Sequence, residues 1–245
     1  MTVFGATGIT AKYGQGTVLD QVDLPTLNDN EVLGLLGPNA SGKSTLMRCL
    51  SGEKSTTGHI TIDGRTRADM GHDGWHHRLA SMPQSPPNPS ALLPTELMWS
   101  TARALDLDVS DRELADQIEG IFARLGLSEF ALSPLHTLSG GKRQLVGLAL
   151  ALMRDPDVLL LDEPTSALDM SVQAQIVELL RDLQARHKMA YLFISHDLRV
   201  VRALSHRVMV MQGGKLVESG AAADVFDHPQ QPYTKALLAA ALDLK

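Results

Sequence analysis

A glycine-rich loop between a short apolar run and a helical segment restricts this chain more than any other feature. The loop reads Gly37-Pro-Asn-Ala-Ser-Gly-Lys-Ser-Thr45 and satisfies the pattern G-x-x-x-x-G-K-[ST]. Residues 31–36 before it are typical of a buried strand, and residues 44–50 after it of a helix. This order predicts an α/β fold with a phosphate-binding loop at the end of a strand.

Each part of this phosphate loop has an expected role in holding a nucleotide. Backbone N–H groups surround the phosphates, and the helix N-terminus adds a favourable dipole. Lys43 is expected to contact the β- and γ-phosphates, and Ser44 to offer a hydroxyl to Mg²⁺. Alanine at position 40 costs free energy only where φ is positive. The predicted ATP-binding residues here are Gly37, Pro38, Asn39, Ala40, Ser41, Gly42, Lys43, Ser44 and Thr45.

A second apolar run, residues 158–161, ends in two carboxylates, Asp162 and Glu163. Its lack of alternation predicts a strand inside a parallel sheet, which presents Asp162 at the carboxyl edge, where ligands bind in open α/β sheets. We expect Asp162 to reach Mg²⁺ through water. Glu163 is the predicted general base that polarises the attacking water.

A second glycine-rich element, Leu138-Ser-Gly-Gly-Lys-Arg-Gln144, opens a helical segment of residues 139–154. Ser139 is typical of a helix N-cap and can also donate to a phosphate. Gly140 and Gly141 allow close approach of the backbone, and the positive end of the helix would face the γ-phosphate. We call residues 138–144 the signature segment.

Composition sets limits on the class of protein. Hydrophobic residues make up 44% of the 245 residues, enough for a sizeable core. A net charge of −6 argues against broad nucleic-acid binding, and the lone Cys49 against a disulfide framework. The sequence contains neither an apolar run long enough to span a membrane nor a secretory signal. We therefore expect a cytosolic chain, unless a partner holds it at a membrane.

Proline placement suggests how one α/β domain is organised. Residues 83–94 hold five prolines and cannot form helix or central strand. Helical patterns follow at 95–105 and 110–125, so residues 85–135 read as a helical insert in a core of residues 1–84 and 136–245. His72, His76 and His77 lie beside glycines, which favours a polar surface loop over a metal site. Further helices are predicted at 171–188, 197–204 and 234–242, and strands at 17–24, 59–64, 190–195, 207–212 and 215–218.

Taken together, the phosphate loop, the signature segment and the strand before Glu163 resemble an ATP-binding cassette (ABC) ATPase of a transporter. This resemblance implies a RecA-like P-loop NTPase core with an antiparallel β-subdomain and an inserted α-helical subdomain. Gln84 resembles the glutamine that contacts Mg²⁺ or water, His196 the histidine that holds the γ-phosphate, and Tyr13 the aromatic residue that stacks on adenine. Two departures are Ala40, where glycine is usual, and Lys142, where glutamine is usual. The signature residues expected to act in trans are Ser139, Gly140, Gly141, Lys142 and Gln144, and those of the D-loop are Ser166, Ala167, Leu168 and Asp169.

The resemblance also implies partners and cofactors. Such chains bind ATP and Mg²⁺ in a head-to-tail dimer with an identical or related second ATPase subunit. The dimer drives transmembrane permease subunits at the cytoplasmic face of the inner membrane, typically with a substrate-binding protein, and nucleic acid is not an expected partner.

Two ends of the chain resemble different importers. Residues 228–238 are similar to the tail of peptide and nickel importer ATPases, whereas residues 37–39 and 79–84 look more like iron–siderophore importer subunits. We favour uptake of peptides, nickel or a metal chelate, because the tail is the more unusual feature. A siderophore importer is the alternative. A soluble ABC ATPase of DNA repair or translation is a further one, although the chain shows neither a coiled-coil insert nor a second cassette.

Overall fold

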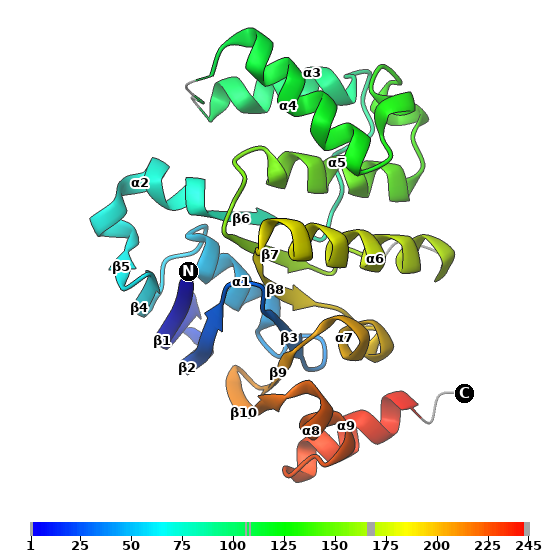
Figure 1. Cartoon of the computed structure of the whole chain (residues 1–245). Coiled ribbons are helices and arrows are strands. Elements are labelled where there is room, and N and C mark those ends of the chain that lie inside the picture. Colours follow the sequence, from blue (N-terminus) through cyan, green and yellow to red (C-terminus); the bar gives the residue numbers. More distant parts are fainter. Residues whose placement is uncertain (1, 106, 108, 166–169, 243–245) are drawn as a thin grey trace.

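The protein contains two β-sheets (Figure 1). The computed structural model describes residues 2–105, 107, 109–165 and 170–242. The larger sheet has the strand order β10-β9-β3-β8-β7-β6, and the smaller has the order β2-β1-β4-β5. Strands of the larger sheet are parallel except β10, which pairs antiparallel with β9. The strands are β1 Val3–Tyr13, β2 Gly16–Asn28, β3 Val32–Leu36, β4 Thr57–Ile62, β5 Arg65–Thr66, β6 Leu79–Met82, β7 Val158–Asp162, β8 Ala190–Ile194, β9 Arg207–Gln212 and β10 Lys215–Ala221.

Helices cover both faces of the larger sheet, and further helices lie beyond each of its edges, β6 and β10 (Figure 1). Helices α3 and α4 lie between β6 and α5 in the chain and stand apart from the sheets at the top of the figure. The antiparallel second sheet and the inserted helices confirm the predicted fold class, whereas the boundary of the insert at residues 85–135 stays a prediction. The helices are α1 Lys43–Ser51, α2 Arg67–Arg78, α3 Pro94–Ala104, α4 Asp111–Arg124, α5 Gly140–Leu152, α6 Met170–His187, α7 Leu198–Leu204, α8 Ala222–Asp227 and α9 Pro232–Leu242.

The central strands are buried on both faces, as their unbroken apolar runs predict. Successive side chains of a strand point to opposite faces, so β7 contributes to two cores. Val158 and Leu160 belong to the core between the two sheets, which also contains α1. Leu159 and Leu161 belong to the core that includes α5 and α6. This burial fixes the strand ends, and with them the side chains at the carboxyl edge.

Helix α2 corrects the prediction of a loop around the three histidines. Thr66 and Asp69 form a capping box that starts the helix, and Trp75 anchors it in the core. Gly71, with φ +73° and ψ 172°, interrupts the helical backbone, so α2 consists of two helical segments that meet at a kink. His72 and His76 therefore lie on one face, with ring centroids 4.4 Å apart. Among the described residues no cluster of three or more metal-ligating side chains occurs, here or elsewhere.

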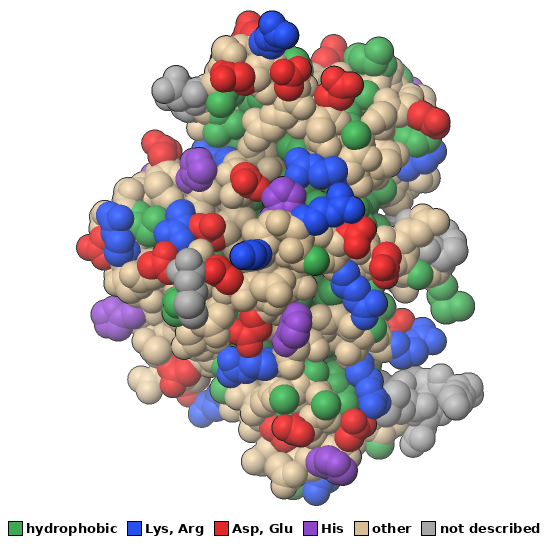
Figure 2. All heavy atoms as spheres, in the orientation of Figure 1, with side chains coloured by type: hydrophobic (Ala, Val, Ile, Leu, Met, Phe, Trp, Pro, Cys, Tyr) green, Lys and Arg blue, Asp and Glu red, His purple; other side chains and the backbone are tan. Residues whose placement is uncertain are grey.

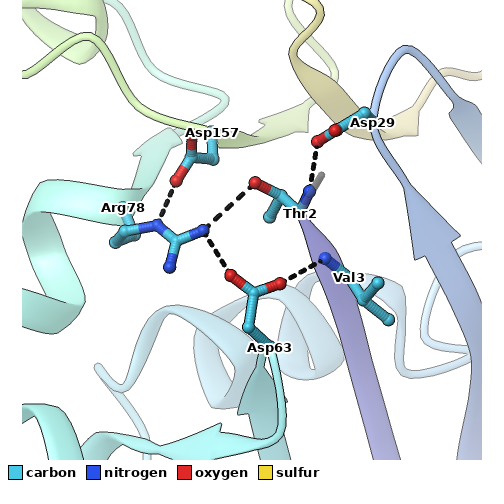
Figure 3. Close-up of polar contacts among 6 residues, drawn as sticks. All are labelled: Thr2, Val3, Asp29, Asp63, Arg78 and Asp157. Carbon is cyan, nitrogen blue, oxygen red and sulfur yellow. Dashed lines mark hydrogen bonds and ion pairs between the residues drawn. The ribbon is translucent and has the colours of Figure 1, made fainter.

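A polar network joins the two sheets at the amino-terminal edge of the parallel strands (Figure 3). The Arg78 guanidinium donates to Asp157 and Asp63, and Asp63 accepts from the Val3 amide at 2.7 Å. Burial alone would raise the pKa of Asp63, but Arg78 and the Val3 amide hold it below its ordinary value. The network links β1 and the β4–β5 turn to the starts of β6 and β7.

Candidate functional site

The phosphate loop lies between β3 and α1, at the carboxyl edge of the larger sheet. Gly37 has φ +150°, and a Cβ there would lie 2.4 Å from the Met211 carbonyl oxygen. Gly42 has φ +103°, and a Cβ there would meet the Leu19 side chain at 2.8 Å. Both positions require glycine, because neither the backbone conformation nor the space admits a side chain.

Ala40 has φ +61°. The condition under which alanine is costly at this position is therefore met, since an L-residue in the left-handed region is strained. The loop keeps a shape that glycine would adopt without this cost.

Lys43 is buried at the start of α1, and its Nζ donates to the carbonyl oxygens of Gly37 and Pro38 at 2.8 and 2.9 Å. Burial lowers the pKa of Lys43, while the carboxylates Glu163 and Asp162 oppose that shift. The ammonium group is therefore held between the loop backbone and the two carboxylates, where it can meet phosphate oxygens.

Asp162 ends β7 and carries one buried carboxylate oxygen, Oδ1, without a hydrogen-bond partner. Burial raises the pKa of Asp162 above its ordinary value, against a hydrogen bond from Ser44 and the positive charge of Lys43. A buried oxygen without a partner is uncommon in folded proteins. Asp162 and Ser44 thus offer oxygen ligands suited to a hard cation such as Mg²⁺.

Glu163 stands at the centre of a contact that joins three separate segments. Its carboxylate is buried, with 6% of the residue exposed. Gln84 Nε2 donates to Glu163 Oε2 at 2.7 Å, and His196 Nε2 lies 2.5 Å from Oε1. Glu163 also has φ +52°, a strained conformation of a kind that clusters at functional sites. The three predicted catalytic residues therefore meet at one carboxylate.

The signature segment begins α5 as expected, with Ser139 as N-cap accepting from the Lys142 amide. Ser139 is exposed, and among the described residues no hydrogen bond joins it to the phosphate loop of its own chain. Lys142 places its Nζ 3.4 Å from the centre of the Phe130 ring, a cation–π contact. Its charge is therefore directed onto the helical insert.

Gln144 does not fit its predicted place among the residues that act in trans. It is only 2% exposed, and its Nε2 donates to the backbone oxygen of Gln84 at 3.4 Å. Gln144 therefore holds the loop that carries Gln84, a role that the sequence pattern did not reveal.

Of two further predicted regions, the structure describes only one. Tyr13 ends β1 with its side chain half-exposed and Lys54 Nζ 4.0 Å from its ring centre, so a cation already covers part of the ring. The predicted D-loop residues Ser166, Ala167, Leu168 and Asp169 lie outside the described part of the chain.

A groove of about 850 Å³ runs beside Gln84, between the core and the helical insert. We call it the subdomain groove. Its walls are mainly apolar and come from β6, the proline-rich loop after it, α3 and α5, and they include Met82, Pro87, Leu97, Leu150 and Arg154. An open apolar groove of this size is suited to a protein or ligand partner.

Comparison with known proteins agrees with this geometry. The profile of the ABC transporter family matches residues 19–166. The peptidoglycan transport ATP-binding protein YejF of Agrobacterium fabrum is 42% identical over 236 residues, covering 93% of this chain and 42% of the relative. The dipeptide transport ATP-binding protein DppF of Haemophilus influenzae is 37% identical over 239 residues, covering 95% of this chain and 73% of the relative. The chain thus spans less than half the length of the YejF relative.

Solved structures share the fold. A nucleotide-free ATP-binding cassette of an ABC transporter superposes with a TM-score of 0.84 at 21% identity, covering 97% of this chain and 98% of that one. The ADP conformation of an ATP-binding cassette gives 0.82 at 21% identity, with the same coverage. With its phosphate loop, paired carboxylates and signature segment on this fold, the chain belongs to the ABC transporter family.

Proposed function

We propose that this chain hydrolyses ATP to power a peptide importer through separate permease subunits. The observation that carries the chemistry is the buried Glu163 carboxylate, held between Gln84 and His196 beside the phosphate loop. From this position Glu163 orients and deprotonates the attacking water, while His196 faces the γ-phosphate. Lys43 and the loop amides hold the phosphates in line for transfer.

Asp162 and Ser44 would hold Mg²⁺, with Gln84 at the same edge of the site. Bound magnesium would supply charge neutralisation for the β- and γ-phosphate oxygens. The unpartnered buried oxygen of Asp162 supports this proposal, because a cation would satisfy it.

Substituting Glu163→Gln tests the assignment of the base. The amide keeps the shape of the side chain but removes the basic carboxylate, so turnover should fall about a hundredfold or more while ATP binding persists. ATPase assays with calorimetric titration of ATP measure both. Glu178→Gln, on the exposed side of α6, is the matched control. Near-wild-type turnover in the Glu163 variant would refute the role.

The subdomain groove is where we propose that the permease docks. Its apolar walls include the loop that carries Gln84, so an occupant there would bear on the residue that contacts Glu163. None of the described helices could itself cross a bilayer. Contact with a permease would place the chain at the cytoplasmic face of the membrane.

Figure 2 shows acidic and basic side chains interspersed on one face, which suits a protein partner better than nucleic acid.

Peptides are the substrate class that we favour over nickel and iron–siderophore chelates. Relatives with substantial identity carry the names of dipeptide and peptidoglycan transport proteins. The oligopeptide transport protein OppF of Escherichia coli is also 36% identical over 231 residues, covering 91% of this chain and 69% of the relative. A substrate-binding protein would then deliver the peptide to the permease.

Uptake in a strain that lacks this chain would test the substrate class. Labelled di- and oligopeptides, nickel and a ferric chelate are compared after complementation with the wild type or with Glu163→Gln. We expect only the wild type to restore peptide uptake. Restoration of nickel or ferric-chelate uptake alone would overturn the assignment to peptides.

A further inference from the structure

Lys54 covers part of the Tyr13 ring. Its Nζ lies 4.0 Å from the centre of the ring, within the range of a cation–π contact. The carboxylate next to Lys54 in the sequence, that of Glu53, lies 3.6 Å from Arg48 instead. Among the described residues, none forms an ion pair with Lys54. The aromatic ring is therefore the main partner of this ammonium group within the described chain.

The segment that carries Lys54 is fixed on both sides. The Lys54 amide donates to the Arg48 carbonyl oxygen at 2.9 Å, which ties the segment to the end of α1. Thr56 Oγ1 donates to the Thr10 carbonyl oxygen at 2.8 Å, which ties it to β1, the strand that ends at Tyr13. Helix α1 begins in the phosphate loop. Lys54 therefore lies on a continuous, hydrogen-bonded connection from the phosphate loop to the Tyr13 ring.

The Tyr13 ring stands at a turn that contains glycines. Gly14 has φ +58° in this turn, and Gly16 is the residue of β2 that pairs with Tyr13. Neither glycine offers a side chain that could pack on the ring. Because 48% of Tyr13 is exposed, the ring also presents surface that Lys54 does not cover. An aromatic ring with one face held and the other open is suited to stacking with a flat base.

We propose that Lys54 is a positioning residue for nucleotide binding, which holds the Tyr13 ring so that adenine stacks on its open face. The inference rests on the proposed function, since it takes Tyr13 as the residue that meets the base of ATP. A ring that is already held loses less conformational freedom when the ligand binds. Because α1 connects Lys54 with the phosphate loop, the held ring also keeps a set distance from the phosphate groups.

A simpler role for the same charge would be to attract phosphate groups. Such attraction acts on any anion and does not need the ring. Positioning through Tyr13 acts only on a ligand that contains a base. ADP and inorganic pyrophosphate separate the two roles, because both carry two phosphate groups and only ADP carries adenine. Neither ligand has a γ-phosphate, so hydrolysis does not disturb the measurement.

The test is calorimetric titration of the full chain with ADP and with pyrophosphate, both in the presence of Mg²⁺. We expect Lys54→Met to bind ADP about three- to fivefold more weakly, as the loss of an exposed cation–π contact implies, and to bind pyrophosphate like the wild type. Lys54→Arg should recover the affinity for ADP, because a guanidinium also contacts a ring face. Lys12→Met removes the exposed charge next to Tyr13 in the sequence and, as the matched control, should leave both affinities unchanged.

A double-mutant cycle shows whether Lys54 acts through the ring. Tyr13→Leu alone should weaken ADP binding, and Lys54→Met added to it should cause no further loss. Retained pyrophosphate binding shows that each variant is folded, and Lys54→Gln repeats the measurement with a polar side chain.

Three results would overturn the inference. One is an ADP affinity of Lys54→Met that is tighter than that of the wild type or within about 1.5-fold of it. Another is an equal loss for ADP and pyrophosphate, and the third is a full loss from Lys54→Met in the Tyr13→Leu background. A wild-type chain that binds neither ligand would instead refute the proposed function, and the inference with it.

Discussion

Ala40 illustrates strain at the scale of a residue. Its φ of +61° is one that glycine adopts freely, and for alanine it costs roughly 1 kcal/mol. Ala40→Gly should therefore raise the free energy of unfolding by about 0.5–1 kcal/mol. Urea denaturation measures the change. Ala131→Gly is the matched control, because Ala131 has φ −54° and glycine there relieves no strain. The control should lose stability, and an equal loss for Ala40→Gly would contradict the argument.

Glu218 shows how one side chain can hold an element. Its two carboxylate oxygens accept from the backbone amides of Gln230 and Gln231 at 2.8 and 3.1 Å. These bonds fix the turn that enters α9, so the tail that favoured a peptide importer also has a structural role. Burial alone would raise the pKa of Glu218, but its hydrogen bonds hold the pKa below the ordinary value.

Substituting Glu218→Ala should release α9 from β10. Amide hydrogen exchange at residues 230–240 is expected to speed up about tenfold or more, because two backbone amides at the start of α9 lose their acceptor. Exchange in β3 and β7 should not change. Glu178→Ala on α6 is the control, and equal exchange in α9 of both variants would show that Glu218 does not hold the helix.

The network of Figure 3 makes the link between the sheets sensitive to acid. Asp63 has a lower pKa in the folded chain than in the unfolded one, so its contribution is complete above the ordinary carboxyl pKa. That contribution is lost as the pH falls through the folded pKa. Asp63→Asn should therefore be less stable than the wild type at pH 7, with the difference shrinking below about pH 4. Urea denaturation across this range checks the trend, and a difference independent of pH would contradict it.

If ATP is bound between two chains, the pair has two catalytic sites. Each site then combines the phosphate loop of one chain with the signature segment of the other. Ser139 is exposed, and within the described part of the chain it makes no hydrogen bond to the phosphate loop. Chains with Ser139→Arg and chains with Lys43→Ala should each hydrolyse ATP poorly. A mixture of the two should regain part of the activity, because a mixed head-to-tail dimer restores one intact pair of loop and signature segment.

The control for this mixture replaces the Lys43→Ala chain with one that carries both substitutions. No intact pair can then form, so activity should stay low. Chains with Ala40→Cys and Ser139→Cys provide a second measurement, since ATP should promote a crosslink between different chains. A crosslink formed only within one chain would contradict the dimer.

Local patterns were sufficient for much of the fold. The unbroken apolar runs predicted β3, β7 and β8, and the prolines correctly excluded helix and central strand up to residue 93. The exclusion was wrong at Pro94, which opens α3, because proline is tolerated in the first turn of a helix. These features are encoded by neighbouring residues, so they need no tertiary information. No local pattern predicts a strand at β1, because Gly5 and Gly8 weaken the strand signal. Its strand conformation depends instead on pairing with β2 and β4.

The sequence alone predicted which residues form most of the candidate site, because the glycine-rich loops and the paired carboxylates carry their chemistry in adjacent positions. Only the tertiary structure decided how they meet. Gln84, Glu163 and His196 come from separate segments, and sheet order brings them to one carboxylate. The burial of Gln144 and Arg154 likewise depends on packing between the insert and the core, because burial is a property of the assembled layers.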